Sequence, residues 1–447
     1  MKVVIPIHHF PPRYQAGAEN YTFRLARWLL RRGHAVRVVC VESIDAAPGS
    51  GVNSRDELYE GIPVSRLSID LVGTADAFER GIVNPAIGAW FGALLERERP
   101  DLVHLNSCYL LSVAPIDATK RLGLPLLVTL HDYWFLCPRI TLLTGTGAPC
   151  GVPEDPAACA WCLATERRRF RLPEIATHGA LGRVGRPLLH SPTVARWLGV
   201  APDANAIADR RARVWQALNQ ADLVIAVTEF QRQLFLRHGF PAARMVLNRL
   251  GVDAPATTRP PRPADPAELR LVYIAQIQPH KGAHLLIEAV NRLRIGRRAV
   301  RLRVYGDASA APAYARRLRT LAAGNPAIEL MGAVANARVG DCLADADALV
   351  MPSLWPENSS VAVLEALAAG RPAVVARIGA LPELVRDGVD GLTFEPGDVT
   401  ALTAVLQRLL DTPALTDELA RQTRPPRRVD DEMGELLSLY RRVAGAA

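Results

Sequence analysis

The chain has 447 residues, 49% hydrophobic and 22% charged, and 53 basic against 45 acidic side chains leave a net charge of +8. This length predicts two or three domains with sizeable cores, and the composition is typical of a soluble globular protein. No apolar run approaches the roughly 20 residues of a membrane helix, and the N-terminal apolar stretch is too short for a secretory signal. A membrane-spanning protein is thereby excluded, and we expect a cytoplasmic one.

The first half of the chain alternates short β-rich runs with helical spacing. A helix is predicted over Glu19–Arg32, and strands over Lys2–Ile7, Ala35–Val41, Asp101–Asn106, Pro125–Leu130 and Asp222–Val227. Strands that alternate with helices imply a parallel sheet covered on both faces. Ligands are then expected at the carboxyl ends of the strands.

Two loops at such strand ends carry candidate site residues. Gly17 follows the first strand within Ala16-Gly17-Ala18-Glu19, where small residues let backbone amides approach a phosphate. His131 follows the strand that ends at Leu130 and opens the segment His131-Asp132-Tyr133-Trp134. A lone histidine is more often a structural residue, but its position at a strand end favours a place at the ligand site.

Four cysteines crowd into one loop: Cys137, Cys150, Cys159 and Cys162, with 12, 8 and 2 residues between them. Four thiolates can form a closed structural zinc site, although a stronger signal would have two Cys-x-x-Cys pairs. The alternatives are four reduced thiols or, under oxidising conditions, a disulfide. The remaining cysteines, Cys40, Cys108 and Cys342, stand among apolar residues and are predicted to be core thiols.

Residues 166–215 hold ten arginines and four acidic residues, a local charge of +6. The segment places Trp197 and Trp215 close to arginines, which suits the headgroup region of an anionic membrane. An anionic glycan acceptor or a solvated arginine-rich face fits as well. No helix-turn-helix, zinc-finger pair or aromatic RNA-binding signature appears, so we expect no nucleic-acid partner.

Residues 254–268 carry five prolines and are the best linker candidate. Beyond them, strands are predicted over Leu271–Ala275, Val300–Tyr305, Ile328–Met331, Ala348–Met351 and Ala373–Ala376, and helices over Ala283–Leu293, Ala313–Ala323, Val361–Ala369, Val399–Leu410 and Asp430–Val443. The chain therefore divides into an N-terminal domain (1–253), a linker (254–268), a second domain (269–425) and a C-terminal helix (426–447). Two Rossmann-like domains with parallel sheets facing a central cleft are the expected architecture.

The loop after the first strand of the second domain reads Ala275-Gln276-Ile277-Gln278-Pro279-His280-Lys281-Gly282. Lys281 is predicted to meet a phosphate as a point charge, and Gly282 lets the backbone approach closely. Gln276 can donate a hydrogen bond but carries no charge. An ordinary strand-to-helix turn with an exposed lysine is the alternative.

A second pattern in this domain brackets seven residues between two carboxylates, Glu357 and Glu365. It follows an apolar strand and a Pro-Ser turn, and it leads into a helix that stops at Gly370. The amides of the intervening loop then lie at a helix N-terminus, where anions bind; they belong to Asn358, Ser359 and Ser360. Asp345-Ala346-Asp347 has the form of a metal motif, but it runs directly into a buried strand and is predicted to be a helix end and strand start.

Together these motifs resemble those of the retaining GT-B glycosyltransferases, especially glycosyltransferase family 4 (glycosyl transferases group 1). The resemblance rests on the Glu357–Glu365 pattern, the Lys281-Gly282 loop and the His131 segment, and it covers most of the chain. The chain departs from the family where Ala275, Gln276 and Ala16 replace a glycine, an arginine and a glycine.

The resemblance implies an α/β protein of GT-B fold that moves a hexose from a UDP- or GDP-sugar to a glycan or lipid-linked glycan, without a catalytic metal. Lys281, Gln276 and the amides of Ser359 and Ser360 would stabilise the diphosphate, Glu357 would hold the sugar hydroxyls, and Glu365 would hold the ribose. His131 would lie beside the transferred sugar, and the acceptor would be presented by the N-terminal half.

Two rival interpretations remain. A catalytically silent GT-B protein that binds a glycan or scaffolds an assembly is supported by the three departures from the family pattern. A nucleotide-sugar epimerase or a phosphorylase on the same fold would use the same phosphate loops.

Overall fold

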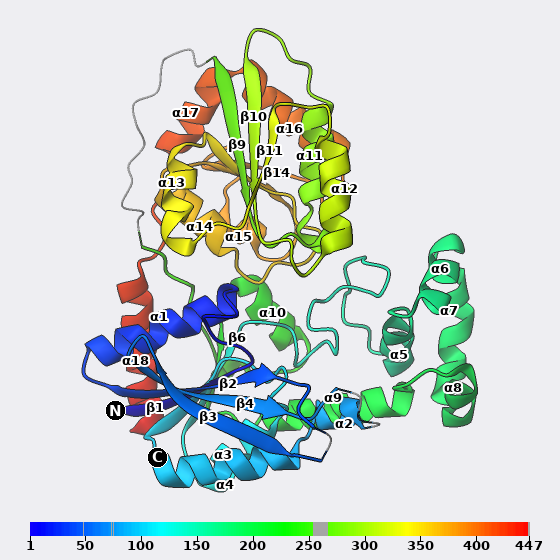
Figure 1. Cartoon of the computed structure of the whole chain (residues 1–447), viewed down its shortest axis with the longest axis vertical. Helices are drawn as coiled ribbons and strands as arrows, with labels where there is room; N and C mark the ends of the chain where they lie inside the picture. Colours follow the sequence, from blue (N-terminus) through cyan, green and yellow to red (C-terminus); the bar gives the residue numbers. More distant parts are fainter. Residues whose placement is uncertain (48, 73, 75, 254–266, 446–447) are drawn as a thin grey trace. The chain divides into compact units, whose positions relative to one another are not determined.

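The computed structural model describes residues 1–447 except 48, 73, 75, 254–266 and 446–447, and it divides into two compact units (Figure 1). Unit 1 comprises Met1–Val227, Arg232–Asn248 and Met433–Ala447, and unit 2 comprises Thr228–Gln231 and Arg249–Glu432. The predicted linker lies outside the described residues except for its last two, and Glu268 already begins a strand. Within the described ranges, no helix combines the length and hydrophobicity needed to cross a bilayer.

Unit 1 is built on an eight-stranded sheet in the order β3-β4-β2-β1-β5-β6-β7-β8. Its strands are β1 (Lys2–Ile7), β2 (Ala35–Ser43), β3 (Val52–Tyr59), β4 (Ile62–Ile69), β5 (Leu102–Leu105), β6 (Leu126–Leu130), β7 (Leu223–Ala226) and β8 (Met245–Leu247). The sheet is parallel, as predicted, except at one edge, where β3 runs antiparallel to β4. That hairpin escaped prediction because β3 is polar and mostly exposed, so it lacks the apolar pattern of a buried strand.

The helices of unit 1 connect these strands and also form an outlying group. They are α1 (Gly17–Arg31), α2 (Ala77–Arg80), α3 (Pro85–Glu98), α4 (Ala114–Arg121), α5 (Pro156–Ala164), α6 (Arg168–Ala176), α7 (Ala180–Gly185), α8 (Pro192–Leu198) and α9 (Ala204–Leu218), with 3₁₀ turns η1 (Arg186–His190) and η2 (Ala242–Arg244). Two more helices divide between the units, α10 (Glu229–Arg237) and α18 (Val429–Ala444). Figure 1 shows α6, α7 and α8 gathered at the outer end of unit 1, away from its sheet.

Unit 2 carries a six-stranded parallel sheet in the order β11-β10-β9-β12-β13-β14. Its strands are β9 (Glu268–Ile274), β10 (Ala299–Tyr305), β11 (Ile328–Gly332), β12 (Ala348–Met351), β13 (Ala373–Ala376) and β14 (Gly391–Phe394). Its helices are α11 (Ala283–Asn291), α12 (Pro312–Ala322), α13 (Val339–Ala344), α14 (Val361–Ala368), α15 (Leu381–Leu384), α16 (Val399–Asp411) and α17 (Pro413–Arg421), with η3 (Pro279–Lys281) and η4 (Asn336–Arg338).

Helices cover both faces of the unit 2 sheet. Leu271 and Tyr273 of β9 belong to one apolar cluster, together with residues of α11, α12 and α16. Val272 and Ile274, the alternate residues of the same strand, belong to a second cluster with residues of α13 and α14. The alternation follows from the two-residue period of a strand, and burial on both faces explains why β12 and β13 are continuously apolar.

The strand order reverses once in each unit, next to the first strand. In unit 2 the chain passes from β9 to β10 on one side and returns to β12 on the other; in unit 1 the same happens between β1 and β5. At such a point the loops that leave the two neighbouring strands diverge and open a crevice at their carboxyl ends. The loops after β9 and β12 are therefore the first place to look for a site in unit 2.

The C-terminal helix α18 belongs to unit 1 from Met433 onward. Its Tyr440 hydroxyl is hydrogen-bonded to His104 Nδ1 of β5 at 2.6 Å, and His104 Nε2 is bonded to Thr129 Oγ1 of β6 at 2.7 Å. All three side chains are buried. The end of the chain thus forms part of the core of the unit that contains its beginning.

Candidate functional site

The centre of the candidate site is an ion pair between the two loops at the reversal point of the unit 2 sheet. Lys281 Nζ, after β9, donates to both carboxylate oxygens of Glu357, after β12, at 2.7 and 3.0 Å. Ser353 Oγ donates to Glu357 Oε1 at 3.0 Å, and the ammonium group lies 4.6 Å from the centre of the Trp355 ring. Glu357 is 3% exposed, so its charge is held by these donors rather than by bulk water.

Close backbone packing holds the two loops together. Gly282 has φ +76°, and a Cβ there would lie 1.8 Å from the carbonyl oxygen of Pro352, which leaves room for glycine alone. Leu354 N donates to His280 O at 2.8 Å. Burial lowers the pKa of His280 to about 4, so this ring is neutral at pH 7 and Lys281 carries the charge of the loop.

The helix α14 begins directly after the Glu357 loop. Ser360 is its N-cap residue and makes no side-chain capping hydrogen bond, and Ser359 precedes it, so the amides of both residues lie just before the first turn of the helix. Asn358 is buried, whereas Ser359 and Glu365 are half-buried, and Glu365 lies one turn into the helix. Gln276 is exposed in the loop after β9.

The structure thus gathers Lys281, Gly282, Glu357 and the start of α14 at one edge of the unit 2 sheet. Sequence reasoning missed two members of this group, Ser353 and Trp355. Both stand within four residues of Glu357, in the turn Pro352-Ser353-Leu354-Trp355-Pro356. An aromatic residue in a proline-bounded turn beside a buried carboxylate was the signal that could have identified them.

Gly17 and His131 belong to unit 1, at the carboxyl ends of β1 and β6. Gly17 is exposed and opens α1, and a Cβ there would meet no atom within 4 Å. The His131 ring lies 4.4 Å from the ring of Tyr21, which is on α1. Burial lowers the pKa of His131 to about 3, and among the described residues its Nε2 atom is buried without a hydrogen-bond partner.

The neighbour of His131 anchors its loop. Asp132 accepts a hydrogen bond from Ser107 Oγ at 2.9 Å and another from the backbone N–H of Trp134 at 2.9 Å. Burial raises the pKa of Asp132, and these donors oppose that rise. The imidazole is therefore held as a neutral side chain on a fixed loop.

The prediction that Asp345-Ala346-Asp347 is not a metal site is supported by the contacts of both carboxylates. Asp345 follows α13 and pairs with Arg270 and Arg303, while Asp347 accepts bonds from the Arg270 N–H and guanidinium at 2.7 and 2.9 Å. These residues precede β12, so they lie at the opposite end of that strand from Glu357.

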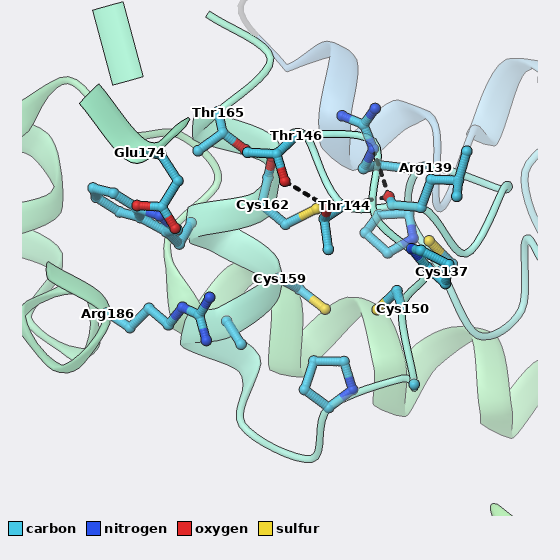
Figure 2. Close-up of a pocket in the computed structure, with 17 residues that line it drawn as sticks. Cys137, Arg139, Thr144, Thr146, Cys150, Cys159, Cys162, Thr165, Glu174 and Arg186 are labelled. Atoms are coloured by element: carbon cyan, nitrogen blue, oxygen red, sulfur yellow. Dashed lines mark hydrogen bonds between the residues drawn. The ribbon is translucent and has the colours of Figure 1, made fainter. Parts of the chain in front are cut away.

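The four clustered cysteines of unit 1 line one pocket of about 260 Å³, shown in Figure 2. Burial raises the pKa of Cys137 and Cys150, and it raises that of Cys162 to about 12. Of the other cysteines, Cys40 and Cys108 are buried as predicted, whereas Cys342 is half-buried. Within the described residues, no group of three His, Cys, Asp or Glu side chains stands ready to hold a metal ion.

The basic segment 166–215 does not form one surface, which corrects the prediction for its second part. On α9, Arg210 is buried, Arg211 is bonded to the carbonyl oxygens of Pro153 and Glu154, and Arg213 pairs with Asp117. Trp215 packs beside Phe235 and Phe240, so it does not face solvent with Arg213. The first part, α6 to α8, is largely exposed.

The comparisons with known proteins agree with this geometry. The model of the family described as glycosyl transferases group 1 matches residues 268–412, and that of the glycosyl transferase 4-like domain matches residues 16–171. Glycogen synthase of Mycobacterium tuberculosis is 30% identical to the chain over 435 residues, which cover 95% of this chain and 89% of that protein.

Two solved structures share the fold over nearly the whole chain. Sucrose-phosphate synthase from Thermosynechococcus elongatus superimposes with a TM-score of 0.65 and 17% identity over 100% of both chains. Anabaena HepE in complex with UDP-glucose superimposes with a TM-score of 0.62 and 18% identity over 98% of this chain and 100% of that one. At such identities the two structures establish the GT-B fold, and the reaction has to be argued from the residues of the site.

Proposed function

This chain belongs to the group 1 glycosyltransferases of the GT-B fold, and we propose that it transfers a hexose from a nucleotide-sugar to a glycan or lipid-linked glycan with retention at the anomeric carbon. The observation that carries the proposal is the Lys281–Glu357 pair at the reversal point of the unit 2 sheet. A cation and a carboxylate side by side suit a ligand that has a phosphate next to a polyhydroxylated sugar.

In the proposed complex, the donor takes over the contacts that Lys281 and Glu357 now make with each other. Lys281 binds the phosphate oxygens, and Glu357 accepts hydrogen bonds from the sugar hydroxyls while Ser353 still holds it in place. The bond to the leaving diphosphate breaks with negative charge growing on its oxygens. We propose that Lys281, the amides of Ser359 and Ser360 just before α14, and Gln276 stabilise that charge.

Retention is proposed because the Lys281-Gly282 loop and the Glu357–Glu365 pattern resemble those of the retaining family. Since Glu357 is proposed to hold sugar hydroxyls and Glu365 the ribose, we propose no covalent intermediate on either carboxylate. In a front-face reaction, the leaving phosphate itself accepts the proton of the attacking hydroxyl, so the protein must supply charge stabilisation rather than a nucleophile. This need matches what the site contains.

For the donor, we propose a UDP- or GDP-sugar, with Glu365 as a paired acceptor for the ribose diol. The Anabaena neighbour solved with UDP-glucose puts UDP-sugars first in a donor screen. No catalytic metal is proposed, because Lys281 and the helix N-terminus supply positive charge where the diphosphate would lie.

In unit 1, we propose that Gly17 and His131 contact the transferred sugar or its phosphate. The open space above Gly17 allows a ligand to approach the N-terminus of α1. His131 would hydrogen-bond a sugar hydroxyl as a neutral imidazole, since its pKa of about 3 excludes a charged form at pH 7.

We further propose that α6 to α8 contact an anionic membrane at its cytoplasmic face, where a lipid-linked acceptor would be found. Six exposed apolar side chains project from this stretch of unit 1: Leu172, Ile175, Leu181, Val184, Leu188 and Trp197. Six exposed arginines accompany them: Arg167, Arg168, Arg169, Arg171, Arg183 and Arg196. Of the acids in this stretch, Glu166 pairs with Arg139, whereas Glu174 is buried and accepts a hydrogen bond from Gly182 N.

The proposed function is tested by replacing Lys281. Lys281→Ala should lower kcat by a factor of roughly 100–1000, as expected for loss of one preformed charge stabiliser. Turnover is measured with the donor that most raises the thermal unfolding temperature of the wild type, because a bound ligand stabilises the folded state by mass action.

Gln276→Arg is the matched control, since it changes the same loop while adding a cation, and it should remain active. Thermal unfolding of both variants shows whether a loss of activity reflects unfolding, because Lys281→Ala leaves Glu357 buried without its cation. A folded Lys281→Ala enzyme with near-normal turnover contradicts the assignment. No turnover, and no donor hydrolysis, by the wild type with any nucleotide-sugar would favour a silent binding protein.

A further inference from the structure

The four cysteines that line the unit 1 pocket come from two separate pieces of backbone. Cys137 ends a turn in which its N–H donates to Tyr133 O at 2.7 Å. Cys150 ends a tight loop in which its N–H donates to Leu142 O at 2.8 Å, next to an antiparallel bridge between Leu143 and Pro149. Cys159 and Cys162 are three residues apart on α5, which places them on one face of that helix.

The thiols therefore line one pocket because of the fold and not because of their sequence spacing alone. Figure 2 shows the sulfur atoms of Cys150 and Cys159 pointing toward one another inside the pocket. Cys162 Sγ lies 3.9 Å from Leu143 O of the facing loop. Two separate segments thus present thiols to one space.

Several arginines lie beside these thiols; Arg139 pairs with Glu166, and the carboxylate of Glu174 also lines the pocket. Arg211 donates from its guanidinium to Cys159 Sγ at 3.1 Å. Arg210 is 3% exposed, and among the described residues one of its terminal nitrogens is buried without a hydrogen-bond partner, as is Nε of Arg186, which also lines the pocket. Neither arginine forms an ion pair with a carboxylate of the described chain. A buried cation of this kind is costly unless an anion lies nearby.

We propose that Cys137, Cys150, Cys159 and Cys162 bind one zinc ion as thiolates. Four thiolates around Zn²⁺ carry a net charge of −2, which the guanidinium groups of Arg210 and Arg211 would offset. A closed set of four sulfur ligands is typical of a structural site and leaves no position for substrate. As the structure stands, the sulfurs are not close enough to share an ion, so binding must draw the Cys137–Cys150 loop onto α5.

The site would act on the architecture of unit 1. The loop that carries Cys137 starts six residues after His131, and α5 is the helix from which α6 to α8 extend. Metal binding would therefore fasten the outlying helices to the loop that follows β6. This inference concerns folding of unit 1 and does not depend on the proposed transferase activity.

The test is the metal content of the full chain, purified with a reductant and without chelators. Elemental analysis should find about one zinc per chain. The double variant Cys159→Ser/Cys162→Ser should lose it, whereas Cys342→Ser, which removes a half-buried thiol of unit 2, should keep it. After removal of zinc by a chelator, Co²⁺ should produce the intense sulfur-to-cobalt absorption of a tetrahedral thiolate site, and proteases should cut faster within residues 137–162.

The wild-type measurements decide the question even if the double variant fails to fold. Less than about 0.1 equivalent of any transition metal, together with no cobalt absorption, overturns the proposal. A disulfide between two of these cysteines that persists in protein purified with a reductant also overturns it. One equivalent of iron in place of zinc overturns the zinc assignment, because four thiolates can also hold a single iron.

Discussion

At the scale of single residues, Gly282 decides whether the loop after β9 can pack against the loop after β12. Its positive φ and the approach of Pro352 O leave no room for a side chain. Gly370, at the end of the α14 segment, has a comparable φ of +67° but no atom within 4 Å of a Cβ. Replacing Gly370 with alanine therefore tests backbone strain alone, whereas replacing Gly282 tests the same strain together with a steric clash.

We predict that Gly282→Ala destabilises unit 2 by clearly more than Gly370→Ala, and that it also weakens donor binding. Gly370→Ala should cost roughly 1–2 kcal/mol, the strain of a left-handed non-glycine residue. Gly282→Ala adds a backbone displacement on top of that strain. Denaturant unfolding and calorimetry with the donor measure both effects; equal losses in the two variants would show that the loops are looser than described.

Glu365 provides the second test at this scale. Glu365→Ala should weaken nucleotide binding by roughly 1.5–3 kcal/mol, because the ribose diol loses a charged acceptor. Glu288→Ala is the matched control, since Glu288 is another helix glutamate of unit 2 and forms an ion pair with Arg317. Unchanged affinity of a folded Glu365→Ala protein in calorimetry would remove this residue from the donor site.

At the scale of elements, α6 to α8 are largely exposed to solvent and lie away from the sheet of unit 1 (Figure 1). Leu172 and Ile175 lie three residues apart and so share one face of α6, and Trp197 on α8 is 84% exposed. Apolar side chains among arginines suit the boundary between lipid headgroups and acyl chains.

We predict that the chain co-sediments with anionic vesicles and not with neutral ones, and that the binding weakens as salt is added. Each arginine near such a surface contributes roughly 1 kcal/mol, and salt screens the attraction. Trp197→Ser and the pair Leu172→Ser/Ile175→Ser should reduce binding. Leu58→Ser, which removes a 73% exposed side chain on β3, should not. Equal and negligible binding to both kinds of vesicle would leave a soluble acceptor as the better proposal.

At the scale of the whole molecule, the C-terminal helix α18 packs into the core of unit 1, which also contains the N-terminal strand. His104 and Tyr440 are separated by 336 positions yet share a buried hydrogen bond. Burial lowers the pKa of His104 to about 3, as it does for His131. In the unfolded chain both rings would take up a proton near pH 6.5. In the folded protein they stay neutral well below that pH.

This difference predicts that the protein loses stability as the pH falls below about 6.5, the ordinary pKa of histidine. Below that pH the unfolded chain binds protons that the folded chain does not, so each of the two histidines contributes a loss of about 1.4 kcal/mol per pH unit until its folded pKa is approached. Thermal unfolding between pH 7.5 and 5 measures the slope. His104→Gln should flatten it, and an unchanged slope would mean that His104 is protonated in the folded protein.

Much of the secondary structure was determined by local sequence alone. β1, β12 and β13 have the bounds that their apolar runs predict, because a buried strand needs a short, continuous apolar stretch between polar turns. The placing of Lys281 and Glu357 at the carboxyl ends of two strands also followed from the sequence. So did the assignment of Asp345 and Asp347 to a helix end and a strand start.

What only the tertiary structure decided is which of these segments become neighbours. The ion pair of Lys281 and Glu357 exists because β9 pairs with β12, and the return of α18 to unit 1 joins residues from opposite ends of the chain. The same holds for Arg210 and Arg211, which a count of charges assigned to the surface: the fold buries Arg210 and brings Arg211 to the thiol of Cys159. Periodicity and turn residues act over a few positions, whereas strand order and helix packing depend on contacts between distant segments that compete for the same core.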